Sequence, residues 1–169
     1  MMHDTETRPT VRPVGSAPKK FSFAGASFQW TGVEPQAYKF SVGDIRGMGW
    51  RDVTRFTLAG PPAWPVEFEL RYFELAPGGY SSFEKHTHPH IIIALRGQGR
   101  AVVGRELFTL DPFDIVQVPP QTPHRWLNEG REPFGFLCPV AAHRDTPQPL
   151  SPGEWVVLRD DPTIAPYVF

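Results

Sequence analysis

Turn-forming residues occur along the whole length of this chain, and they restrict it to short elements of secondary structure. Its 169 residues include 20 prolines and 15 glycines. Proline fixes φ and removes a backbone donor, whereas glycine accepts positive φ, so both residues interrupt helices and favour turns. Apolar residues at helical spacing do not extend over any useful length. The chain is therefore predicted to be mainly β.

Alternating or apolar runs between these turns predict the strands. In the run 66–75, one face carries Val66, Phe68, Leu70 and Tyr72, and the other carries Glu67, Glu69 and Arg71. The predicted strands are residues 50–58, 66–75, 91–95, 100–103, 107–110, 115–118 and 134–140, with a strand-like stretch at 155–158 and one or two short rim strands within 21–30. Many short strands with close turns are typical of a sandwich or barrel.

The length of the chain suits one domain with a core of its own. Residues 1–20 are polar and contain prolines, which predicts a disordered tail. Residues 21–160 are predicted to form a single barrel domain, and residues 161–169 a C-terminal extension. No internal repeat indicates a second domain.

Charge and cysteine content exclude several classes of partner. The 17 basic and 18 acidic residues give a net charge of −1 and form no blocks, which does not favour binding to nucleic acid or to a membrane surface. No apolar run reaches the roughly 18 residues of a membrane span. The single cysteine, Cys138, cannot form an intrachain disulfide, and it is interpreted as a buried apolar residue. We expect a cytoplasmic protein.

Three of the six histidines occur within five residues, and they carry the strongest chemical signal. In an extended strand, alternate side chains project to the same face, which here carries Glu84, His86, His88 and His90. Imidazole and carboxylate ligands suit borderline divalent metals, whereas calcium and magnesium prefer oxygen ligands. The predicted cofactor is one divalent transition metal per chain: iron, manganese, nickel, copper or zinc. His143 is interpreted as a solvated surface residue.

Two motifs in register resemble the metal-binding motifs of the cupin superfamily. The first motif reads Gly78, five residues, Glu84-x-His86, three residues, His90, six residues, Gly97, with Glu and His exchanged between the first His slot and the Glu slot. The second motif has Asp114, Pro119, His124 and Asn128 in their usual slots, with Phe113 and Gln121 in place of the two usual glycines. The resemblance covers roughly residues 66–140.

This resemblance implies an all-β fold, a single double-stranded β-helix or jelly-roll barrel with N- and C-terminal extensions. It also implies that the metal ligands are Glu84, His86, His90 and His124. His88 is then either a fifth ligand or a residue that contacts the ligands or the substrate. An alternative register makes His86, His88 and His124 the ligands and leaves Glu84 free to act as an acid or base.

The resemblance favours an enzyme in which a small organic substrate binds the interior metal, most of all a dioxygenase-type oxidoreductase. A redox-neutral isomerase or lyase on the same site is an alternative. So is a non-catalytic, metal-dependent binding or sensor protein. By analogy with other cupins, we expect a homodimer. The substrate pocket is predicted to be lined by Tyr80, Ile92, Ala94, Phe134 and Phe136.

Overall fold

The computed structural model describes residues 19–39, 46–62, 64 and 66–169, so residues 1–18 of the tail predicted at 1–20 lie outside the described residues. The chain divides into two compact units, which meet between Gly32 and Val33. In the first unit, β1 and β2 form a two-stranded antiparallel sheet of their own. The elements are β1 (Phe23–Ala24), β2 (Gln29–Trp30), β3 (Gln36–Ala37), β4 (Arg51–Ala59), β5 (Phe68–Tyr80), β6 (Glu84–Lys85), β7 (His90–Arg96), β8 (Gly99–Val103), β9 (Glu106–Leu110), β10 (Ile115–Val118), β11 (His124–Leu127), β12 (Phe134–Ala141), β13 (Gln148–Pro149), α1 (Pro152–Arg159) and the 3-10 helix η1 (Ala165–Tyr167).

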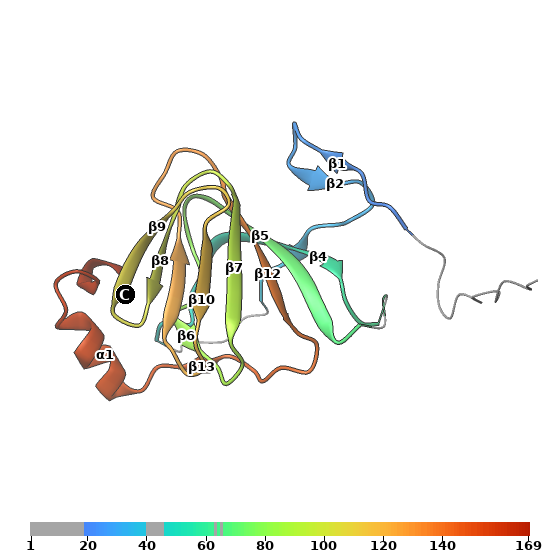
Figure 1. Cartoon of the computed structure of the whole chain (residues 1–169). Helices are drawn as coiled ribbons and strands as arrows, with labels where there is room; N and C mark the ends of the chain where they lie inside the picture. Colours follow the sequence, from blue (N-terminus) through green and yellow to red (C-terminus); the bar gives the residue numbers. More distant parts are fainter. Residues whose placement is uncertain (1–18, 40–45, 63, 65) are drawn as a thin grey trace, which may run out of the picture. The chain divides into compact units, whose positions relative to one another are not determined.

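The second unit is an antiparallel barrel made of two connected parts (Figure 1). One part contains β10, β7, β12, β5, β4 and β3, and the other contains β9, β8, β11, β6 and β13. They join where Leu127 of β11 pairs with Tyr80 at the end of β5. The predicted all-β barrel is therefore confirmed. Among the described residues, no helix is both long and apolar enough to cross a membrane.

Strand alternation separates an inner core from an outer one. On β8, Ala101 and Val103 face the inner core, while Val102 faces the outer one. The long strand β5 is covered on both faces at its centre, where Arg71 is 8% exposed and Tyr72 is fully buried. Of the charged face of the run 66–75, Arg71 thus turns toward the barrel interior, whereas Glu67 stays exposed. This placement brings Arg71 to the cavity described below.

The helix α1 covers the outer face, and it replaces the strand-like stretch expected at 155–158. Ser151 caps the helix and forms a capping box with Glu154, whose side chain accepts from the backbone N–H of Ser151 at 2.7 Å. Trp155 and Leu158, three residues apart, then reach the outer core together. The strand prediction was wrong because two adjacent valines favour strands locally, whereas the cap and burial favour a helix.

Two turns of the barrel keep the backbone that glycine usually supplies in the second motif. Phe113 has φ of 79° and Gln121 has φ of 59°, and both lie in the left-handed region. Side chains with a Cβ adopt this region at a cost of roughly 1–2 kcal/mol. The substitutions therefore leave the turns intact and add local strain. Gln121 also ties its turn to the segment after β6, since its backbone N–H donates to the carbonyl of His86 at 2.7 Å.

Replacing these two residues by glycine is expected to stabilise the protein. Each of Phe113→Gly and Gln121→Gly removes the left-handed strain, and the greater entropy of glycine in the unfolded chain cancels part of the gain. We expect up to about 1 kcal/mol per substitution, measured by urea unfolding. Gln117→Gly, in the regular strand β10, is the matched control and should be destabilising. A loss of stability in both turn variants would contradict the strain argument.

Candidate metal centre

A cavity of about 620 Å³ lies inside the barrel unit. Aromatic and aliphatic side chains, among them Phe73, Trp126 and Phe136, form part of its wall. The remaining wall is strongly polar, with four histidines, two carboxylates and four cationic side chains. The cavity can therefore hold a small polar molecule in contact with the histidines.

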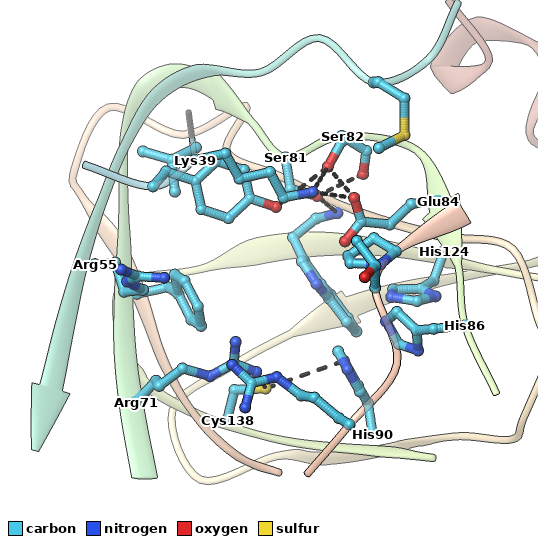
Figure 2. A pocket seen from close by; sticks show the side chains of 18 of the residues that line it. Lys39, Arg55, Arg71, Ser81, Ser82, Glu84, His86, His90, His124 and Cys138 are labelled. Atoms are coloured by element: carbon cyan, nitrogen blue, oxygen red, sulfur yellow. Dashed lines mark hydrogen bonds and ion pairs between the residues drawn. The ribbon is translucent and has the colours of Figure 1, made fainter. Parts of the chain in front are cut away.

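Three buried histidines converge on one point of this cavity. His90 begins β7, His124 begins β11, and His86 follows directly after β6. One ring nitrogen from each residue lies within 4.8 Å of the other two. Figure 2 shows the three rings together on one side of the cavity. Strand pairing sets this arrangement, because His124 pairs with Glu84 across β11 and β6, and His90 pairs with Val118 across β7 and β10.

The hydrogen bonds of these rings fit a metal site. The Nδ1 atom of His86 lies 3.1 Å from the carbonyl oxygen of His88, and the Nδ1 atom of His124 lies 2.9 Å from that of Thr122. A neutral ring that donates from Nδ1 leaves a lone pair on Nε2, and such carbonyl contacts commonly orient metal-binding imidazoles. The Nε2 atom of His86 is buried and has no hydrogen-bond partner in the described part of the chain. His86, His90 and His124 could therefore hold a divalent transition metal.

Burial keeps the three imidazoles neutral. It lowers the pKa of His86 to about 4, with His124 and His88 adding to the effect. Burial also lowers the pKa of His90, as do His124 and His86. The pKa of His124 is lowered by burial although the nearby carboxylate of Glu84 opposes this shift. The rings are thus neutral at physiological pH, which is the form that binds metals.

Glu84 is buried at the edge of this cluster, and it does not belong to the group of three converging nitrogens. Its Oε2 atom accepts hydrogen bonds from Lys39 and from the hydroxyl of Ser82 (Figure 2). Burial alone would raise the pKa of Glu84, but the charge of Lys39 and the hydrogen bonds from Lys39 and Ser82 lower it. Glu84 is therefore an anion at neutral pH, able to act as a base or as an additional ligand.

His88 is held outside the group of three by Asp145. The carboxylate of Asp145 accepts from the backbone N–H groups of Thr87 and His88, and its Oδ1 atom lies 2.6 Å from Nδ1 of the His88 ring. On its other side, Nε2 of His88 lies 2.9 Å from Nε2 of His90. This geometry favours the register with His86, His90 and His124 over the one with His88, and it gives His88 the position of a residue that orients His90.

Of the five predicted pocket residues, only Phe136 lines the cavity. Ile92, Ala94 and Phe134 are fully buried in the inner core, where neighbouring side chains cover them completely. Tyr80 packs on the outer core beside Phe169, because the adjacent Ser81 takes the inward direction. Apolar character alone did not distinguish core from cavity wall, since both are lined by the same residue types.

Sequence analysis missed the polar residues opposite and around the histidines. These include Lys39, Ser82, Asp145 and three arginines, Arg55, Arg71 and Arg144, all of which line the cavity. Ser82 had a local signal, because it lies within the first motif and alternation places it on the same face as Glu84 and His86. Arg71 had none, because alternation only grouped it with Glu67 and Glu69. Lys39, Arg55, Arg144 and Asp145 lie outside both motifs, so no spacing rule connects them with the histidines.

Comparison with known proteins agrees with the fold and the motifs. Residues 71–140 match the family described as Cupin domain. The chain belongs to the cupin superfamily. It is 36% identical over 143 residues to 1-methylthio-D-xylulose 5-phosphate methylsulfurylase of Rhodospirillum rubrum, covering 85% of this chain and 88% of that protein.

Solved structures give the same result. A cupin-2 domain from Rhodospirillum rubrum superposes with a TM-score of 0.73 at 35% identity, covering 90% of this chain and 97% of the other. A cupin 2 conserved barrel domain protein from Rhodopseudomonas palustris gives a TM-score of 0.76 at 33% identity, covering 88% of this chain and 98% of the other. These similarities extend well beyond the motif region.

Proposed function

We propose that this protein is a metal-dependent enzyme that acts on a small phosphorylated sugar carrying a methylthio group. The observation that carries the proposal is the convergence of three neutral histidines on a cavity that can hold such a molecule. The relative from Rhodospirillum rubrum, whose name specifies 1-methylthio-D-xylulose 5-phosphate, supports the choice of substrate. A bound metal would supply Lewis-acid or redox chemistry at the histidines.

The chain's own residues can perform two tasks beside the metal. His86, His90 and His124 hold fixed, neutral ring nitrogens toward one point, so a substrate oxygen or sulfur atom can be oriented there. Glu84 is a buried carboxylate beside His124 and can remove a proton from the substrate. The ammonium group of Lys39 forms an ion pair with Glu84 and keeps this carboxylate ionised.

The experiment is a turnover assay with 1-methylthio-D-xylulose 5-phosphate. Protein loaded in turn with iron, manganese, nickel, copper or zinc is incubated with the sugar phosphate, and its consumption is followed by mass spectrometry. We expect turnover with at least one metal, and a loss of about 100-fold or more in kcat/KM for Glu84→Gln, the range of general-base catalysis. His143→Ala, at an exposed site, is the control. Lack of consumption with every metal would reject the proposal.

A dioxygenase-type oxidation is the second candidate. Three neutral imidazoles leave coordination positions open for both a substrate and dioxygen, and this donor set suits redox-active metals. An oxygen electrode in the same assay distinguishes the two candidates. Stoichiometric oxygen uptake would favour oxidation, whereas consumption of the sugar phosphate without oxygen would favour redox-neutral chemistry. Binding of the sugar phosphate without any change in it would indicate a binding or sensor protein.

A further inference from the structure

A second polar group lines the same cavity as the histidines, and it consists of three arginines. Arg55 comes from β4, Arg71 from β5, and Arg144 from the segment after β12. Figure 2 shows Arg55 and Arg71 on the side of the cavity away from His86 and His124. The fourth cation, Lys39, lies instead at the histidine side beside Glu84, and Arg71 approaches His90 through Cys138. The cupin motifs explain the histidines and not the arginines.

Within the described chain, two of the three guanidinium groups have an unpartnered donor. Arg144 forms an ion pair with Glu69 at 2.5 Å and donates from Nη1 to the carbonyl of Ala141 at 3.2 Å. Arg71, only 8% exposed, donates from Nη2 to the sulfur of Cys138 at 3.2 Å, and burial raises the pKa of this thiol, so the sulfur carries no charge. The Nε atoms of Arg55 and Arg71 are buried without a hydrogen-bond partner among the described residues. Buried, unpartnered donors of this kind are costly unless a ligand satisfies them.

The three arginines lie close enough to influence one another. Burial lowers the pKa of Arg55, the carboxylate of Glu69 opposes this shift, and the charges of Arg71 and Arg144 add to it. A structural role explains part of the cluster, because the guanidinium of Arg71 stacks over Phe73 at 5.1 Å. The stacking of Arg71 on Phe73 does not require Arg55 and Arg144 at the same place. It also leaves the buried Nε atoms of Arg55 and Arg71 without a hydrogen-bond partner in the ranges that the structure describes. An oxyanion in the cavity would satisfy both charge and donors.

We propose that Arg55, Arg71 and Arg144 form a binding site for the phosphate group of a phosphate monoester, separate from the metal centre. The planar guanidinium fork matches phosphate oxygens, and a dianion would compensate the excess positive charge of the cluster. This inference rests on the proposed function, and it adds that the substrate lies across the cavity, with its phosphate at the arginines and its reacting end near the histidines. The arginines thereby determine which molecules bind and how they are oriented.

The test uses ribose 5-phosphate as a probe and compares it with ribose and inorganic phosphate by isothermal titration calorimetry. Ribose 5-phosphate and inorganic phosphate are expected to bind the wild-type protein, and ribose is not. Binding of both phosphates should persist in His86→Ala, because the arginines and not the metal hold the phosphate. Absence of phosphate binding to the wild type, or equally tight binding of ribose, would overturn the proposal.

Arginine variants identify the site. Arg55→Gln and Arg144→Gln are each expected to weaken ribose 5-phosphate binding about 10-fold, and the double variant about 100-fold, the range for charge-assisted hydrogen bonds. Arg71 is buried, so Arg71→Lys is tested beside Arg71→Gln, and circular dichroism verifies the fold. Arg51→Gln, on the same strand as Arg55 but exposed and outside this cavity, is the matched control and should bind normally.

The outcomes separate this inference from the proposed function. Arginine-dependent binding of ribose 5-phosphate without turnover of the methylthio sugar would support the phosphate site and reject the enzyme proposal. Turnover of the methylthio sugar with unchanged KM in the Arg55→Gln/Arg144→Gln double variant would support the enzyme and overturn the phosphate site. Loss of phosphate binding in His86→Ala, with normal binding in the double arginine variant, would place the phosphate at the metal. This result would also overturn the proposed phosphate site at the arginines.

Discussion

The His124→Ala variant is expected to lose its metal and to remain folded. Each of His86, His90 and His124 contributes a nitrogen to the cluster. Loss of a residue that only orients a ligand lowers metal affinity about 10- to 100-fold, so removal of one of these three ligands should lower it further. The inner core of aromatic and aliphatic side chains is retained in these variants, so the barrel should remain folded. Metal content is measured by plasma mass spectrometry on untagged protein, and folding by circular dichroism.

Two other histidines serve as controls for this experiment. His143→Ala, at an exposed position, should retain the full metal content. His88→Ala should lower affinity only within the range of an orienting residue, because the His88 ring, held by Asp145, contacts His86 and His90 and does not belong to the group of three converging nitrogens. A wild-type protein that takes up none of the five metals would reject the metal centre. If His88→Ala lowered metal affinity as much as His90→Ala does, this result would instead favour His88 as a fourth histidine ligand.

The metal-free protein is expected to lose stability as the pH falls from about 6.5 to about 4. The unfolded chain binds a proton at each histidine near pH 6.5, whereas the folded protein keeps His86 neutral down to about pH 4. The unfolded state therefore binds more protons in this window, and the free energy of unfolding decreases as the pH falls. His86 alone contributes at most about 3 kcal/mol, and His90 and His124 shift in the same direction.

Urea unfolding at several pH values measures this dependence, and His86→Gln is the matched variant because it keeps a side chain of similar size. The difference in stability between wild type and variant should narrow, or reverse in favour of the variant, as the pH falls through the window. A difference that stays constant from pH 7 to pH 4 would contradict a neutral, buried His86. Metal affinity of the folded protein should fall only near pH 4, where His86 begins to bind a proton.

Local sequence patterns were sufficient to predict most of the barrel. Alternation and turn residues located the strands that became β4, β5, β7, β8, β9, β10 and β12, with boundary differences of at most a few residues except at the end of β5. The two motifs predicted that His86, His90 and His124 would meet, and they do. Motif spacing works here because paired strands hold side chains at fixed intervals, so the distance along the chain determines which ones share a face.

The same patterns failed where the local signal conflicted with packing. The valines of α1 favour a strand, but the capping box and the burial of Trp155 and Leu158 favour a helix on the outer face. Phe113 and Gln121 raised the question of whether their turns keep the shape made by glycine, and the rest of the barrel holds both in the left-handed region. Tertiary contacts thus overrode single-residue preferences in both cases.

The sequence by itself determined the barrel and the cupin motifs with their candidate ligands Glu84, His86, His90 and His124, because each depends on periodicity within a strand or on spacing between neighbouring strands. Only the tertiary structure decided what surrounds them. Lys39, Arg55 and Arg144 reach the cavity from distant segments, and their approach depends on how β3, β4 and the segment after β12 close over it. Such contacts lie between segments distant in the chain, and a single sequence carries no periodic signal for them.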